Sequence, residues 1–178
     1  MPTRFVQTST IAAESYTGSH CGVGHNPTDD QFYINPDGTK RAVMTGRGNA
    51  RVLTSTTTLT AADFGKTIFL NAATEFVTTL PSPALGARLK IVCANAPESA
   101  SFTVVTASSA NVIYGAIVSS ADAGGSASST AGTPGDTITF VDGQAAVGDF
   151  VQLESDGTNW YAFGVCGDED GITITAAS

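Results

Sequence analysis

Charged residues are scarce in this chain and unevenly placed. Only 13% of its 178 residues are charged, and the formal net charge is −8. No Lys or Arg follows Lys90: residues 1–90 hold eight bases and six acids, for +2, whereas residues 91–178 hold ten acids and no base, for −10. The acidic second half should repel nucleic acid and anionic membranes, so we expect neither as a partner. If one part of the chain binds a partner, the first half is the better candidate.

Cysteine and histidine are also rare. Cys21, Cys93 and Cys166 form an odd set without close spacing, so no disulfide framework is expected, and Cys93 and Cys166 are predicted to be buried small apolar residues. The one cluster of soft metal ligands, HCGVGH from His20 to His25, has no second Cys/His pair at zinc-finger spacing. A glycine-rich bend is therefore favoured there, although trimerisation could bring copies of His20 or His25 together.

No pattern typical of an enzyme active site is present. No GxSxG motif occurs, and both histidines lie in the irregular N-terminal region, which argues against a serine hydrolase. The glycines at 22–24 and 46–48 lack the strand and helix of a phosphate loop, and the acidic run at 168–170 lacks the alternating oxygens of a calcium loop. Paired carboxylates for sugar hydrolysis remain compatible with the spacing, but most late acids adjoin glycines or predicted turns. We expect no enzyme activity, no metal and no cofactor.

Long apolar runs are absent as well. Residues 1–10 have no apolar core of the kind found in signal peptides, and no run is long enough to span a bilayer. These absences predict a protein that is made in a cytoplasm and has no membrane segment.

What the chain does contain is a series of short alternating strands separated by turns, from residue 50 onward. This pattern predicts an all-β fold, an antiparallel β-sandwich or distorted barrel spanning residues 49–178, with a flexible low-complexity loop at 119–135. The predicted strands lie near Arg51–Leu59, Lys66–Asn71, Phe76–Leu80, Leu89–Ala94, Phe102–Thr106, Asn111–Val118, Asp136–Val141, Asp149–Glu154, Trp160–Val165 and Gly171–Thr175.

Residues 1–48 differ from the rest and are predicted to form an extended N-terminal arm. Within this arm the turn sequence NPDG at 35–38 could join Gln31–Ile34 to Lys40–Thr45 as a short hairpin. The remainder of the arm has a broken hydrophobic pattern and is expected to order against a partner.

Two local signals are more specific. In the stretch from Leu59 to Pro81, Thr60 is placed to cap a single helical turn, with Asp63 three residues later and Gly65 free to end the turn with positive φ. In the second, SDGTN at 155–159 predicts a hairpin turn before an aromatic strand.

The aromatic strand leaves two alternatives open. Trp160, Tyr161 and Phe163 could form a surface on which a carbohydrate stacks. Packing in the core and across strands is favoured, because an aromatic strand after a tight hairpin normally serves that purpose.

Together these motifs resemble small β-rich virion proteins of tailed bacteriophages. The resemblance rests on LTAADFGK at 59–66 leading into a strand, TLP at 79–81, a strand at 88–92, and SDGTNWY at 155–161. It covers roughly residues 53–167 and is most like head decoration (cement) proteins, with related cores in tail-fibre and tailspike modules. The short chain, its lack of a repeating shaft and its basic first half favour the head.

The resemblance implies a non-enzymatic structural protein on the outer surface of the virion capsid, synthesised in the host cytoplasm. It would form homotrimers and bind across subunits of the major capsid protein, which stabilises the mature shell. A tail-fibre, tailspike or receptor-binding module is the alternative. Five basic residues of the arm and the first predicted strand, and one aromatic residue near the N-terminus, are the expected capsid contacts: Arg4, Phe5, Lys40, Arg41, Arg47 and Arg51.

Overall fold

The structure of the chain is a computed structural model with two compact units, Met1–Asn49 and Ala50–Ser178. It describes the backbone at residues 22–26, 31–35, 41–45, 49–119, 127–128 and 133–176, and the side chains at 49–119 and 133–176. Each unit is described by itself.

The first unit contains a small antiparallel sheet with the strand order β1-β2-β3. Its strands are β1 (Gly22–Asn26), β2 (Gln31–Asn35) and β3 (Arg41–Thr45). The pairing of β2 with β3 confirms the predicted hairpin across the NPDG turn. The glycine-rich bend expected at residues 20–25 is wrong for residues 22–25, because they form β1 and pair in regular register with β2, Val23 opposite Ile34.

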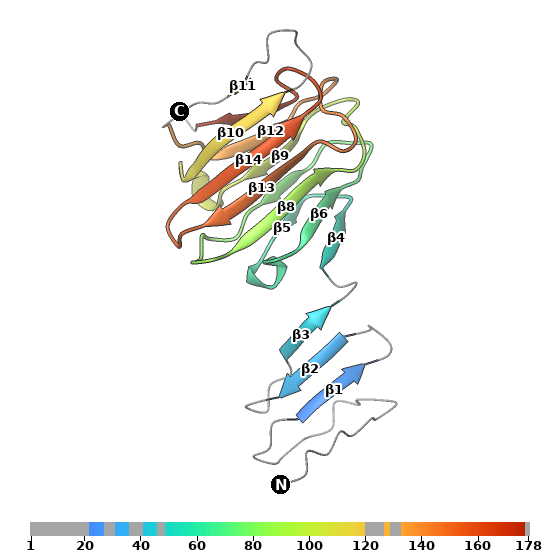
Figure 1. The fold of residues 1–178 in the computed structure, drawn as a ribbon. Helices are drawn as coiled ribbons and strands as arrows, with labels where there is room; N and C mark the ends of the chain where they lie inside the picture. Colours follow the sequence, from blue (N-terminus) through green and yellow to red (C-terminus); the bar gives the residue numbers. More distant parts are fainter. Residues whose placement is uncertain are drawn as a thin grey trace. The chain divides into compact units, whose positions relative to one another are not determined.

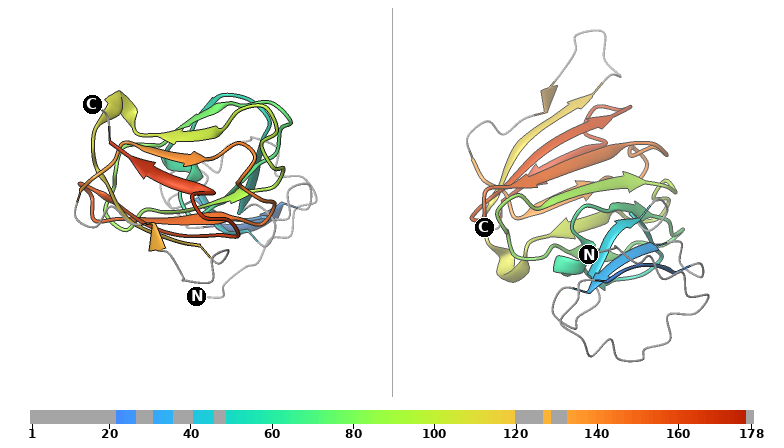
Figure 2. Two further views of the ribbon diagram at one scale, coloured as in Figure 1. Left: turned by 90° about the horizontal axis from the view of Figure 1, so that it is seen from above. Right: turned by 60° about the horizontal axis from the view of Figure 1, so that its bottom comes forward.

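The second unit is a β-sandwich, which confirms the predicted all-β sandwich (Figures 1 and 2). The larger sheet has seven strands in the order β11 (Ala127–Ser128), β10 (Ile113–Ser119), β14 (Trp160–Cys166), β13 (Phe150–Ser155), β8 (Arg88–Cys93), β6 (Thr67–Leu70) and β4 (Ala50–Leu53). The smaller sheet has five strands in the order β15 (Ile172–Thr175), β12 (Thr137–Phe140), β9 (Phe102–Val105), β7 (Val77–Thr79) and β5 (Thr57–Thr58).

The sheets are mixed, whereas purely antiparallel pairing was expected. From β4 to β9 the chain passes to the other sheet after every strand, and each strand lies parallel to the one two places earlier. The short connections therefore lead across the sandwich instead of folding back as hairpins. Antiparallel pairing begins where β12 joins β9 in the smaller sheet and where β13 joins β8 in the larger one. β13 and β14 form the predicted SDGTN hairpin, and β10 then lies parallel to β14.

One predicted strand is divided by this winding. Residues Arg51–Leu59 were expected to be continuous, but they contribute to β4 in the larger sheet and β5 in the smaller one. Most of the predicted loop at 119–135 lies outside the described residues. Two of its residues form β11, which pairs with β10.

The core lies between the two sheets and is built from the inward-facing residues of alternating strands. Trp160, Phe102 and Phe140 are the largest fully buried side chains. The rings of Phe76 and Phe102 have centroids 4.9 Å apart. Burial of these aromatic rings with Ile, Leu and Val side chains supplies the main stabilisation of the sandwich.

The turn predicted after Leu59 is present as a short 3-10 helix, η1 (Ala61–Asp63), with Thr60 as its N-terminal cap residue. The backbone N–H of Thr60 donates to Oδ2 of Asp63 at 3.0 Å. Gly65 then leaves the turn with φ of +81°. These three features confirm the prediction that the sequence makes for this turn.

A second 3-10 helix, η2 (Ala107–Ser109), follows β9. Within the described part of the chain, no helix has the length and apolar character needed to cross a membrane.

Candidate functional site

The outward face of the seven-stranded sheet exposes several large apolar and aromatic side chains. Side chains alternate across each strand, so that β14 buries Trp160, Ala162 and Gly164 and points Tyr161 and Phe163 outward. Tyr161 is 48% exposed and Phe163 is 51% exposed. The strand register places these outward residues in rows that run across the sheet.

One of these rows is entirely apolar and crosses six strands. We call it the apolar row, and its members, in order from β4 to β10, are Val52, Phe69, Val92, Phe150, Val165 and Val118. Val52 and Val118 are 57% and 42% exposed, and the other four are partly buried. A continuous apolar row on an outer sheet face is typical of a surface that contacts another molecule.

A neighbouring row mixes polar and aromatic side chains. Thr67, Lys90, Gln152 and Phe163 lie on successive strands from β6 to β14. The Lys90 Nζ lies 4.2 Å from the centroid of the Phe150 ring, so its cation covers part of the apolar row.

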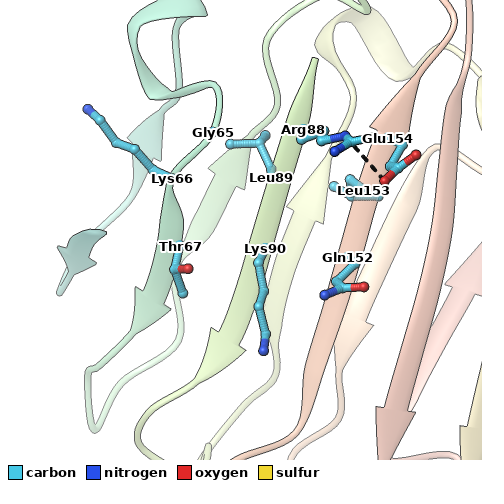
Figure 3. Close-up of a pocket in the computed structure, with 9 residues that line it drawn as sticks. All are labelled: Gly65, Lys66, Thr67, Arg88, Leu89, Lys90, Gln152, Leu153 and Glu154. Carbon is cyan, nitrogen blue, oxygen red and sulfur yellow. Dashed lines mark ion pairs between the residues drawn. The ribbon is translucent and has the colours of Figure 1, made fainter. Parts of the chain in front are cut away.

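The hollow in Figure 3 lies on the same face, toward the beginnings of β6 and β8. It is lined by residues 65–67, 88–90 and 152–154 and has a volume of about 270 Å³. Figure 3 shows the Arg88 guanidinium turned toward Glu154, and the Arg88 Nε lies 3.3 Å from the Glu154 Oε1. Lys66 points away from the other lining residues. The polar side chains of the lining are basic, acidic, amide and hydroxyl groups, from Lys66, Arg88, Lys90, Glu154, Gln152 and Thr67.

Beside this hollow, Asp63 forms a buried ion-pair cluster with two basic residues. Its carboxylate oxygens lie 2.9 Å from the Arg51 Nη1 and 3.1 Å from the Lys66 Nζ. Burial raises the pKa of Asp63, but the hydrogen bond from the Thr60 N–H and the contacts with Lys66 and Arg51 outweigh it. The net pKa lies below the ordinary value. The sequence pattern of the cap identified Asp63, but it did not predict that Arg51 would pair with this carboxylate.

The aromatic residues of β14 lie in two different environments, the core and the outer surface of the sheet. Trp160 is fully buried, its ring centroid is 6.2 Å from that of Phe64, and its Nε1 has no hydrogen-bond partner. Packing therefore explains Trp160, as favoured from the sequence. Tyr161 instead packs across strands on the outer surface, with its ring centroid 6.2 Å from that of Tyr114.

The Tyr161 hydroxyl also joins the hairpin turn, because it donates to Oδ2 of Asp156 at 2.9 Å. The backbone N–H groups of Asn159 and Thr158, followed by this hydroxyl, lower the pKa of Asp156 to about 2. This turn is thus held by a charged carboxylate throughout the neutral pH range.

The residues expected to contact a capsid are only partly described. Arg4, Phe5, Lys40 and Arg47 lie outside the described residues. Arg41 begins β3 and its side chain is not described. Arg51 is engaged with Asp63, although its side chain remains 39% exposed.

The soft-ligand cluster and the acidic run were the other candidate sites. His20 and Cys21 lie outside the described residues, and His25 is in β1 with its side chain not described. Across the side chains that the structure describes, no group of three His, Cys, Asp or Glu is placed to hold a metal. Residues 168–170 form an exposed turn before β15, as predicted.

Cys93 and Cys166 are free and buried, which confirms their predicted role as small core residues. Burial, followed by the nearby Asp149 charge, raises the pKa of the Cys93 thiol to about 11. Burial likewise raises the pKa of Cys166. Both thiols are therefore protonated and unreactive at neutral pH.

Comparison of the chain with models of protein families gives no match, and comparison with curated protein sequences gives no match either.

Proposed function

We propose that this protein is a structural virion protein of a tailed bacteriophage that decorates the mature capsid. It cements the shell by binding across subunits of the major capsid protein. The proposal combines the resemblance of residues 53–167 to head decoration proteins with the surface of the sandwich.

The apolar row is the observation that carries this proposal. A six-strand row of exposed and half-exposed Val and Phe residues is a surface for contact with protein, and it belongs to a sandwich with a well-packed core. Such a domain holds its shape while presenting a broad face for assembly with other protein copies. Cementing a shell requires a rigid domain that is present in many copies, and it requires no catalytic group.

The distribution of charge supports a separate capsid-binding role for the first unit. Four of the eight bases lie before residue 50, namely Arg4, Lys40, Arg41 and Arg47. The second unit is acidic, so it would be repelled by other acidic surfaces and remain toward solvent. Cementing then follows from mass action, because a ligand that binds only the expanded lattice stabilises that lattice against its precursor. Many copies on one shell add avidity.

Binding to capsids in two maturation states tests the proposal. Purified protein is mixed with expanded, undecorated capsids of the phage that encodes it, and separately with unexpanded precursor shells. We expect cosedimentation with expanded capsids alone and a higher temperature of shell disruption after binding. Absence of binding to expanded capsids contradicts the proposal.

The half-exposed rings of Tyr161 and Phe163 favour a second candidate, a tail-fibre or receptor-binding module. Exposed aromatic rings beside polar groups such as Glu154 and Gln152 are suited to stacking on sugars. Glycan-array binding that is lost in Phe163→Ala, together with immunogold labelling at the tail, would support this candidate over decoration.

A further inference from the structure

The outer face of the seven-stranded sheet has a layout that is complementary to itself. Its centre lies between β8 and β13, where Val92 pairs with Phe150. On the β8 side the apolar row continues to Phe69 and Val52, and on the β13 side it continues to Val165 and Val118. Two faces related by a two-fold axis along the strands, between β8 and β13, would interchange these two sides.

This operation places large apolar side chains against smaller ones. Val92 of one copy faces Phe150 of the second copy, and Phe69 faces Val165 of the second copy. No phenyl ring faces another ring within the row, so the two surfaces can interdigitate once the Lys90 side chain, whose Nζ lies over the Phe150 ring, turns aside.

The same operation also matches opposite charges. Arg88 and Glu154 are directly paired across β8 and β13, so Arg88 of each copy faces Glu154 of the other. Lys90 faces the neutral Gln152 of the second copy. Among the outward residues that the structure describes on this face, no two like charges oppose each other, and the dimer holds two symmetric Arg88–Glu154 contacts.

Net charge further favours this face as the self-association surface. Residues 50–178 hold four bases and twelve acids, for −8, so most contacts between two copies are repulsive. The outward residues of the described strands of this sheet include two bases, Arg88 and Lys90, and one acid, Glu154, for +1. Two copies therefore meet here without the repulsion between acids that the net charge of residues 50–178 would otherwise impose.

We propose that two copies of the chain associate through the outer face of the seven-stranded sheet, about a two-fold axis parallel to the strands between β8 and β13. Packed sheets keep their strands aligned to within about 30°, so β6, β8, β13 and β14 form the centre of the contact. This pairing takes the place of the threefold association that the resemblance implies. It rests on the strand register and does not depend on capsid binding.

A charge exchange in the full-length chain tests the pairing most sharply. Arg88→Glu sets two acids against each other at two symmetric places in the dimer, and Glu154→Arg does the same with two bases. Each single change should raise the dissociation constant by about tenfold or more. The double variant restores both contacts and should return to within about threefold of the wild type. Their side chains are 71% and 63% exposed, so the singles should fold normally.

The apolar contact is tested with a matched pair of substitutions. Val92→Glu lies in the centre of the proposed contact, and Val77→Glu lies on β7 of the other sheet, where Val77 is 39% exposed. We expect Val92→Glu to give the mass of a single 18.1 kDa chain and Val77→Glu to keep twice that mass. Circular dichroism checks that both are folded.

Sedimentation equilibrium and light scattering at micromolar concentrations give the readout. A wild-type mass of two chains, with rescue by the double charge exchange, supports the proposal. A monomer, a trimer, or a double variant as weakly associated as the single ones overturns it. If Val92→Glu does not fold, the charge exchange alone decides the outcome.

Discussion

Arg51 places its Nη1 atom 2.9 Å from the Oδ2 atom of Asp63, twelve residues later in the chain. The contact ties β4, the edge strand of the larger sheet, to the 3-10 turn that precedes β6. Lys66 holds the other carboxylate oxygen at 3.1 Å. Asp63 therefore links β4 to the segment that leads into the neighbouring strand β6.

Replacing this carboxylate should destabilise the sandwich. Asp63→Asn removes a charge that caps the turn and pairs with two bases, and we expect a loss of about 2–4 kcal/mol in the free energy of unfolding. Urea denaturation followed by circular dichroism measures it. Glu75→Gln, at an exposed position, serves as the control and should change stability by less than about 0.5 kcal/mol. Equal free energies of unfolding for the two variants would show that the Asp63 carboxylate does not stabilise the sandwich.

The same carboxylate predicts a dependence of stability on pH. The pKa of Asp63 is lowered in the folded state, so its contribution is present above the unfolded pKa near 3.8 and is lost as the pH falls through the folded value. Wild type should therefore lose more stability than Asp63→Asn between neutral pH and pH values below the unfolded pKa. Thermal unfolding across this range measures the difference, and parallel curves for the two proteins would refute the assignment.

Gly115 should tolerate no side chain. It lies opposite Ala162 in the parallel pairing of β10 with β14, and a Cβ atom built on it would collide with the Ala162 backbone carbonyl. We expect Gly115→Ala to destabilise the protein by about 1–3 kcal/mol, because the strands must separate. The control is Ala116→Ser, on the outer face of the same strand. Gly143 is unsuitable as a control although the space around it is open, because its φ of +70° would strain any other residue. Similar melting temperatures for the two variants would contradict the predicted contact.

The two core thiols should react only after unfolding. Cys93 and Cys166 are buried with raised pKa values, which leaves little thiolate at pH 8. Iodoacetamide labelling followed by peptide mass spectrometry should find both unmodified in the native protein and both modified in guanidinium chloride. Rapid labelling of Cys93 in the native state would mean that the edge of the core near Asp149 is open.

Local signals in the sequence predicted part of this structure. The cap at Thr60 and Asp63, the glycine at Gly65 and the SDGTN hairpin were all predictable, because each depends on residues within a few positions of one another. The alternating pattern likewise predicted strands close to β8 and β13, near Leu89–Ala94 and Asp149–Glu154.

The partners of the strands were not predictable in the same way. Alternation tells which face of a strand is buried and leaves the neighbouring strand open, so the parallel winding from β4 to β9 was missed. The break between β4 and β5 was missed because residues 54–56 contain no Gly or Pro. The apolar row depends on the register of six strands, so single segments gave no sign of it. Arg51 was selected for its charge, and only the fold reveals its contact with Asp63.

The most direct test of the proposed function is cryo-electron microscopy of expanded capsids incubated with the purified protein, beside capsids without it. The proposal predicts added density on the outer surface, bridging neighbouring capsid subunits. It further predicts that deletion of residues 1–49 abolishes this density while the remaining chain keeps a β-type circular dichroism spectrum. Bare capsids at saturating protein, or density found only at the tail of intact virions, would contradict the assignment to the capsid.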